Sequence, residues 1–362
     1  MNDDEHYAAL YCSKFPNKDK LDEIKRIIKW DLFRPILNGL FKGTEVGRPH
    51  VDVVVMAKML VLQAWYSLSD EQLEIQCKDR LTFQNFLNFP ESVLDARTVW
   101  LFRERLASSG KEGEFWELFN SQLKGLDLKV KEGESKDVVF MKVGEKEVEA
   151  SKDNAHLQDS TMLEADSGAP TVGDIIRRKQ NEAKGDKDGN GTSISISYDE
   201  LKKSKERGDE AKTRRSVDGT WTKKRNKSYF GYKLHTKVVA RFGLIEDYEV
   251  TTASLHDNRV DLSLPGEPMV RDKAYSFVSA KGIPFTMIRA SRGNPLSDDD
   301  RRVNRILSSI RAHVEHPYAV MRRVFHFTRM YVTTIKRVSV RAMFMCMSFN
   351  LMRIAFLLRP RD

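Results

Sequence analysis

The feature that most constrains the fold is a pair of β-strand patterns separated by a tight turn. Side chains from Lys227 to Ala240 alternate between two sets, which is the two-residue period of a β-strand. Phe242-Gly243 then supplies a turn, and Leu244 to Thr251 forms a second run of strand length. We therefore predict a β-hairpin in this part of the chain.

Shorter strand patterns stand on both sides of the hairpin. They are Ala155 to Leu163, Met269 to Arg271 and Ile283 to Ile288. A short helix is expected near Ser254, with Asp257 as its N-cap. From Asp298 onward the pattern is mainly helical, with a β-like interruption at Tyr331 to Ile335. This order of elements predicts an α/β fold with a central mixed sheet and flanking helices.

Residues 1–127 have helical spacing and predict an all-α N-terminal domain. Asp52 is placed to cap an apolar helix from Val53 to Tyr66. Ser69-Asp-Glu-Gln72 has the pattern of a capping box, and Asp95 is placed to cap a helix that Gly110 ends.

A helix-turn-helix in this domain would use Asp95 to Leu106 as its recognition element. Arg97, Arg103 and Arg105 are then possible DNA contacts. A helical packing domain whose arginines merely face solvent fits the pattern equally well.

The remaining chain divides by composition. Residues 128–154 are polar and predict a linker, with one strand at Val138 to Val143. Residues 155–358 hold the strand and helix patterns of the α/β domain. Within them, residues 167–226 are poor in apolar side chains, which predicts a polar, flexible insertion.

Positive charge is concentrated in two segments of a chain whose net charge is +9. Residues 301–362 carry 13 lysines and arginines against two acidic residues, and residues 201–240 carry 13 against four. Such a distribution indicates a polyanionic partner, with nucleic acid first. Lys223, Lys224 and Arg225 are possible DNA contacts in the second segment.

A glutamate flanked by arginines stands in the C-terminal helical region. A helix from Val303 to Val324 would place Arg311, Glu315 and Arg322 on one face. Pro317 predicts a break just past the glutamate. Taken alone, Arg311 and Glu315 read as an exposed ion pair with spacing i,i+4.

Two aspartates change that interpretation. Asp159 lies inside the strand pattern before the hairpin, and Asp272 ends a later one. Together with Glu315 they are the carboxylates that a two-metal phosphoryl-transfer site requires. Three carboxylates without a cysteine or histidine cluster suit hard divalent cations, Mg²⁺ or Mn²⁺.

The cysteines and the apolar segments bear on the compartment. Cys12, Cys77 and Cys346 are isolated, which fits a reducing cytoplasm. The acidic N-terminus does not have the pattern of a signal peptide. Val338 to Leu358 is apolar but contains Arg341, Asn350 and Arg353, so we expect a core or interface helix.

Motifs along almost the whole chain resemble the insertion-sequence transposases of bacteria and archaea, of the group numbered five. Those that resemble the family's helical N-terminal domain are Trp30-Asp-Leu-Phe-Arg-Pro, Gly47-Arg-Pro, Leu60-Val-Leu-Gln-Ala-Trp-Tyr-Ser-Leu-Ser-Asp-Glu-Gln-Leu-Glu and Thr98-Val-Trp-Leu-Phe-Arg-Glu-Arg-Leu. Those that resemble its catalytic domain are Asp209-Glu-Ala-Lys-Thr-Arg-Arg, Tyr229-Phe-Gly-Tyr-Lys-Leu-His, Val250-Thr-Thr-Ala-Ser-Leu-His-Asp, Arg271-Asp-Lys-Ala-Tyr, Glu315-His-Pro-Tyr-Ala-Val-Met-Arg-Arg-Val-Phe and Asn350-Leu.

The resemblance implies a DDE transposase with an RNase H-like catalytic core. Its acid triad would fall on Asp159, Asp272 and Glu315, with Asp166 as a competitor for the first position. We prefer Asp159 because Asp166 precedes a loop rich in glycine and proline. The triad would hold Mg²⁺ or Mn²⁺ as a pair of ions.

The family's Tyr-Arg-Glu-Lys signature maps onto Ser308, Arg311, Glu315 and Arg322. Its arginine and glutamate are matched, whereas serine replaces the tyrosine and arginine replaces the lysine. Ala274 stands where the family has glycine, which is tolerable only if the backbone there is not at positive φ.

Four cations would then contact DNA phosphates. They are Arg311, Arg322, Lys273 and Arg323.

The activity implied is metal-dependent strand cleavage at element ends and strand transfer into target DNA. The partners implied are the terminal inverted repeats and target DNA, bound by a homodimer that is cytoplasmic and nucleoid-associated, with no membrane. Two alternatives stay open. One is an impaired, transposase-derived DNA-binding protein or repressor, and the other is an RNase H-like nuclease that does not transfer strands.

Overall fold

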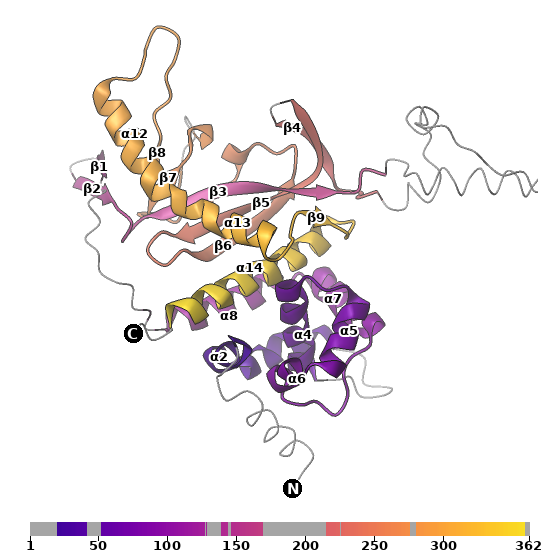
Figure 1. Cartoon of the computed structure of the whole chain (residues 1–362). Helices are drawn as coiled ribbons and strands as arrows, with labels where there is room; N and C mark the ends of the chain where they lie inside the picture. The colour runs from indigo at the N-terminus through magenta and orange to yellow at the C-terminus, as the bar shows by residue number, and fades with distance from the viewer. Residues whose placement is uncertain are drawn as a thin grey trace, which may run out of the picture.

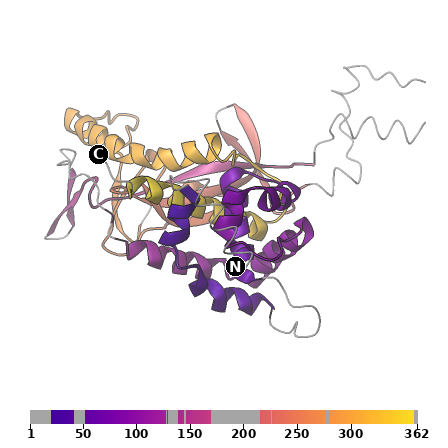
Figure 2. The same ribbon diagram turned by 60° about the horizontal axis from the view of Figure 1, so that its bottom comes forward.

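The computed structural model describes residues 20–41, 52–126, 128, 139–143, 146–168, 215–224, 226–275 and 280–358. A layer of N-terminal helices lies on one side, a curved sheet lies on the other, and the C-terminal helix α14 (Ile335–Leu357) lies between them (Figure 1). The view in Figure 2 shows the same order of layers.

The N-terminal part is helical, as predicted. Its α-helices are α2 (Lys20–Ile27), α3 (Arg34–Asn38), α4 (Val53–Tyr66), α5 (Asp70–Asp79), α6 (Leu81–Leu87), α7 (Ala96–Ser109) and α8 (Glu112–Lys124). The 3-10 helices η1 (Trp30–Phe33) and η2 (Gly39–Phe41) flank α3.

The predicted helix ends are confirmed. Asp52 accepts a hydrogen bond from the backbone N–H of Val54 at 2.8 Å, and Ser69 forms the expected capping box with Gln72. Asp95 caps α7, which ends at Gly110 in the left-handed region with φ of +67°.

The sheet has seven strands and mixes parallel with antiparallel pairs. Its strands are β3 (His156–Ala165), β4 (Thr220–Lys224), β5 (Lys227–Val239), β6 (Leu244–Thr252), β7 (Pro268–Arg271), β8 (Ile283–Thr286) and β9 (Arg329–Met330). The order β4-β5-β3-β7-β8 is completed by β6 beside β5 and β9 beside β3. The predicted hairpin is β5–β6, and the predicted α/β fold with a mixed sheet is confirmed.

Three features differ from the prediction in detail. The expected linker contains a hairpin of two strands, β1 (Val139–Val143) and β2 (Lys146–Ala150), where one strand was expected. The described part of the predicted 167–226 insertion includes β4, an edge strand beside β5. His256, and not Asp257, caps the 3-10 helix η3 (Asp257–Arg259), because its imidazole accepts the Asn258 N–H.

The expected helix from Val303 to Val324 is broken before Glu315, not after it. It consists of α12 (Asp298–Arg311), the 3-10 turn η5 (Ala312–Val314) and α13 (Glu315–Arg323). Pro317 is the third residue of α13, where a backbone N–H has no partner within the helix in any case. The proline is therefore tolerated, and Glu315 begins a helix.

Helix α14 is the centre of the core. Its 18-residue apolar window has a mean hydropathy of 1.4, long and apolar enough to cross a membrane, yet 72% of that window is buried within the protein. Asn350 reaches β6, where its amide pairs with both the N–H and the C=O of Ile245. On the other side, Arg337 forms an ion pair with Glu104 of α7 at 2.6 Å. One hydrophobic cluster thus includes N-terminal helices, α14 and the sheet.

Candidate active site

Two of the three predicted acids come from neighbouring strands, since Asp159 lies in β3 and Asp272 directly follows β7. β3 and β7 are parallel, and Gln158 of β3 is paired with Arg271 of β7. The next residues along the two strands are Asp159 and Asp272, so the register places them next to each other. Asp272 follows the last residue of β7, where its strand leaves the sheet.

The third acid is joined to the first by an arginine. Arg311, the last residue of α12, donates from Nη1 to Oδ2 of Asp159 at 3.0 Å and from Nη2 to Oε1 of Glu315 at 2.9 Å. The expected pair between Arg311 and Glu315 is therefore present, and it extends to a residue 152 positions earlier in the chain. Glu315 remains 64% exposed at the start of α13.

Burial raises the pKa of Asp159, and the charges of Asp272 and Asp257 act in the same direction. The backbone N–H of Ser160 and the guanidinium of Arg311 oppose that shift. A partly buried carboxylate beside a second one is a site that gains stability by taking up a cation.

The predicted phosphate contacts are placed around these acids. Arg322 donates from Nη2 to the hydroxyl of Thr161 at 2.7 Å, two residues along β3 from Asp159. Lys273 and Arg323 are exposed. Arg311, by contrast, is only 18% exposed and is occupied by the two acids.

Asp166, the competing first acid, lies beyond the end of β3. Its side chain accepts the N–H of Gly168 at 2.8 Å. Seven residues of extended strand separate it from Asp159, which corresponds to about 23 Å. The register that brings Asp159 beside Asp272 therefore does not bring Asp166 there.

Two further residues lie near the acids: Tyr318, which sequence reasoning did not single out, and Asp257, which it expected only as a helix cap. The Tyr318 hydroxyl donates to the backbone oxygen of Asp159 at 2.7 Å and lies 2.7 Å from the hydroxyl of Thr236. Asp257 pairs with Lys233 at 3.0 Å and contributes to the potential at Asp159. The signal for both was available, since each lies in a stretch that resembles the family.

The departures from the family pattern are structurally accommodated. Ala274 lies in the 3-10 helix η4 (Lys273–Tyr275) and is not among the described residues with positive φ. An alanine in place of the family's glycine is therefore tolerated, because the backbone at residue 274 is not at positive φ. Ser308 is exposed on α12.

The arginines of the possible recognition helix have different environments. Arg103 is bound by both oxygens of Asp70 at 2.9 Å and by Gln63. Arg105 lies over the ring of Phe41 at 4.4 Å. Arg97 is exposed. Lys223 and Lys224 are also exposed on β4, whereas Arg225 lies outside the described residues.

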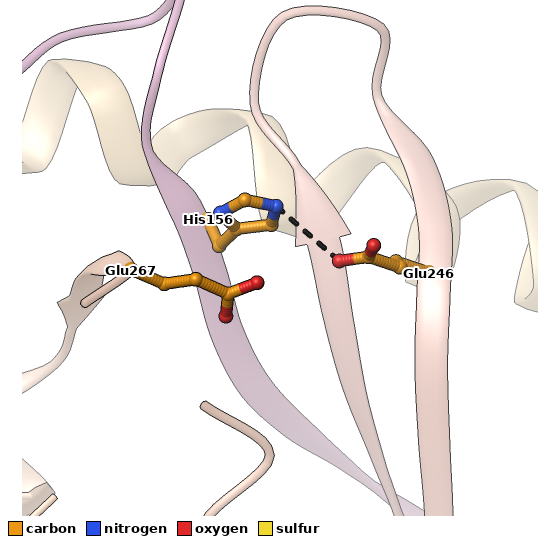
Figure 3. A group of neighbouring side chains, drawn as sticks. All are labelled: His156, Glu246 and Glu267. Atoms are coloured by element: carbon orange, nitrogen blue, oxygen red, sulfur yellow. Dashed lines mark ion pairs between the residues drawn. The ribbon is translucent and has the colours of Figure 1, made fainter. Parts of the chain in front are cut away.

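A second cluster of ionisable side chains, one histidine and two glutamates, lies elsewhere in the sheet. Within the part of the chain that is described, His156, Glu246 and Glu267 form the one group of three whose donor atoms lie within 4.8 Å of one another (Figure 3). The ammonium of Lys237, 2% exposed, lies 3.0 Å from Glu246 and 2.7 Å from Glu267.

This second group reads as an ion-pair cluster. The hydrogen bond from His156, helped by those from Lys124 and Lys237, holds the pKa of Glu246 well below its usual range, against the effect of burial. A buried lysine already supplies the positive charge that a metal ion would bring. The cluster also joins α8 to the sheet, because Lys124 belongs to that helix.

The three acids of the candidate active site suit a divalent ion by chemistry, since carboxylate oxygens are the ligands that Mg²⁺ and Mn²⁺ prefer. Asp272 leaves one carboxylate oxygen without a hydrogen bond among the described contacts, the other accepting the N–H of Lys273 at 2.7 Å. The guanidinium of Arg311 bonds to one oxygen of Asp159 and to one oxygen of Glu315.

Comparison with known proteins identifies the family. The family described as "Transposase domain (DUF772)" matches residues 11–105, and the family described as "Transposase DDE domain" matches residues 208–351. The two matches follow one another in the order of the helical part and the sheet. The chain belongs to the insertion-sequence DDE transposases.

The transposase for insertion sequence element IS1106 of Neisseria meningitidis serogroup B is 29% identical to this chain over 153 residues. The match covers 38% of the chain, and the chain spans about half the length of that relative, 52%. No solved structure matches the chain. The DDE transposase domain implies an RNase H-like fold, in agreement with the mixed sheet, and implies the use of divalent metal ions.

Proposed function

We propose that this protein is a DNA transposase that cleaves strands at the ends of its element and joins them to target DNA. The observation that carries the proposal is the placement of Asp159 beside Asp272, with Glu315 reached through Arg311. The three carboxylates come from β3, the end of β7 and the start of α13, and a site built on rigid elements keeps its ligands in place.

Asp159, Asp272 and Glu315 would hold Mg²⁺ or Mn²⁺, as two ions. When bound, such ions lower the pKa of water and stabilise the departing 3′ oxygen. Tyr318 of α13 donates a hydrogen bond to the backbone oxygen of Asp159 and so ties the start of that helix to β3. Arg322, Lys273 and Arg323 supply positive charge for the phosphates on both sides of the acids.

The partners proposed are the terminal inverted repeats and target DNA, bound by two copies of the chain. Positive charge on α13 and on β4 favours a polyanion, through Arg322, Arg323, Lys223 and Lys224. We place the protein in the cytoplasm, associated with the nucleoid, because its substrate is chromosomal DNA.

The test is cleavage of a duplex that carries the element's end, in Mg²⁺ or Mn²⁺. Glu315→Gln keeps the size of the side chain but removes the charge that a metal ligand needs. We expect cleavage to fall by several orders of magnitude while binding to the duplex is kept, since metal activation lowers the pKa of water by about 8 units in the best cases.

Asp166→Asn is the matched control and should cleave like the wild type, whereas Asp159→Asn should not. Equal cleavage by wild type and Glu315→Gln would remove Glu315 from the mechanism. Specific binding without any cleavage by the wild type would favour a repressor, and cleavage without joining would favour a nuclease.

A further inference from the structure

Arg311 is the one group that contacts two of the proposed metal ligands among the described residues. Its two terminal nitrogens lie 3.0 Å from Oδ2 of Asp159 and 2.9 Å from Oε1 of Glu315. The side chain is mostly buried, and its Nε has no hydrogen-bond partner within the described structure. The guanidinium of Arg311 is therefore positioned by its ion pairs with Asp159 and Glu315.

We propose that Arg311 is the resident cation of the acid site, and that a divalent ion can bind between Asp159 and Glu315 only when Arg311 leaves. The inference rests on the proposed function, because it takes these two acids as metal ligands. Arg311 engages one oxygen of each carboxylate, Oδ2 of Asp159 and Oε1 of Glu315, and carboxylate oxygens are the groups that would coordinate the ion. A guanidinium and a divalent ion also repel one another at contact distance.

When Arg311 leaves the two carboxylates, its guanidinium stays positively charged and loses its hydrogen-bond acceptors. It therefore needs another anion to bind. A DNA phosphate is such an anion, and it matches the planar fork in two hydrogen bonds. Once Arg311 has moved to a DNA phosphate, Asp159 and Glu315 would be free to bind the ion. Binding of DNA and binding of the metal ion should then strengthen one another by the same factor.

The structure thereby assigns Arg311 two positions, one between the acids in the free protein and one on the substrate. The free protein would keep its acids neutralised and its metal affinity low. Metal ions would be loaded mainly when DNA is present, which prevents the metal-bound site from assembling on its own.

The experiment is a titration of the free protein with Mn²⁺ by isothermal titration calorimetry, with Arg311→Gln and Arg311→Lys compared with the wild type. Arg311→Gln should bind Mn²⁺ about tenfold more tightly or better, because apparent affinity falls with the fraction of molecules whose site is closed. Arg311→Lys keeps the charge but cannot bridge two carboxylates with a planar fork, and should lie in between.

Arg305→Gln is the matched control, since Arg305 is exposed on α12 and lies six residues before Arg311. It removes the same charge and should change the Mn²⁺ affinity much less. Adding the duplex that carries the element's end should raise the affinity of the wild type and leave that of Arg311→Gln nearly unchanged. Equal or weaker Mn²⁺ binding by Arg311→Gln than by the wild type would overturn the proposal.

Asp159→Asn and Glu315→Gln separate this outcome from a failure of the proposed function. If both variants bind Mn²⁺ like the wild type, these acids are not the ligands and the function assigned to the site is wrong. If both variants lose Mn²⁺ binding while Arg311→Gln binds Mn²⁺ no more tightly than the wild type, Asp159 and Glu315 are metal ligands. Only the role of Arg311 is then rejected.

Discussion

The imidazole of His235 is completely buried in β5, with its Nε2 2.9 Å from the hydroxyl of Thr251. Burial lowers the pKa of His235 to about 4, although the charge of Asp257 favours the protonated ring. The folded protein thus keeps this ring neutral at a pH where an unfolded chain would protonate it.

This difference predicts a pH dependence of stability. Between the unfolded pKa of about 6.5 and the folded pKa, the unfolded state binds more protons, so the free energy of unfolding falls as pH is lowered through this window. The expected loss from this residue is about 3 kcal/mol between pH 6.5 and 4. His235→Gln should flatten the dependence in urea unfolding measured at several pH values. An unchanged slope in that variant would exclude His235 as its source.

Among the secondary-structure elements, β5 and β3 can approach closely because residue 231 of β5 is glycine. Its φ is +147°, and a Cβ built on it would lie 2.1 Å from the backbone oxygen of Leu163. Backbone cannot yield as a side chain can, so the two strands would have to separate.

Gly231→Ala should therefore destabilise the protein by about 2–4 kcal/mol. Gly113→Ala is the control, because Gly113 lies in α8 with open space around its Cβ position and alanine favours helices. Thermal unfolding of both variants checks the prediction. A Gly231→Ala protein as stable as the wild type would show that the strands can rearrange.

The elements also show how far sequence reasoning reaches. The β5–β6 hairpin and the caps at Asp52, Ser69 and Asp95 were predictable because period and capping are local properties. The break was predicted after Glu315 but lies before it. The turn at 312–314 buries Val314 in the hydrophobic core, a contact that the position of the nearest proline does not reveal.

The candidate site likewise has features that could be predicted from the sequence and features that could not. The two aspartates could be placed at strands from the sequence, but their alignment depends on the register of β3 with β7. The contact of Arg311 with Asp159 could not be predicted, since it joins residues 152 positions apart and uses an arginine that local spacing had already paired with Glu315.

The whole molecule shares one core. Trp116 and Asn120 of α8 donate to the backbone oxygen of Glu246 in β6, at 3.2 and 2.6 Å, and Trp65 of α4 packs near Phe325. The helical layer and the sheet are thus bound together through contacts that neither could make alone.

We expect a single cooperative unfolding transition for the helical layer and the sheet. Four of the five tryptophans, Trp30, Trp65, Trp100 and Trp116, lie in the helical layer, so tryptophan fluorescence reports mainly on that layer. Far-ultraviolet circular dichroism reports on the whole chain. The two signals should change at the same urea concentration. Two separated transitions would show that the parts fold independently, as the predicted division at residues 127 and 155 would allow.

The position of α14 has a consequence for synthesis on the ribosome. Helix α4 ends at Tyr66, but α14, against which it packs, begins at Ile335. At about 5–20 residues per second, α4 must wait roughly 13–55 s for that partner to be made. A premature stop codon anywhere before Ile335 therefore removes the centre of the core. Such a truncated gene would yield a chain that proteases clear, and not a stable fragment.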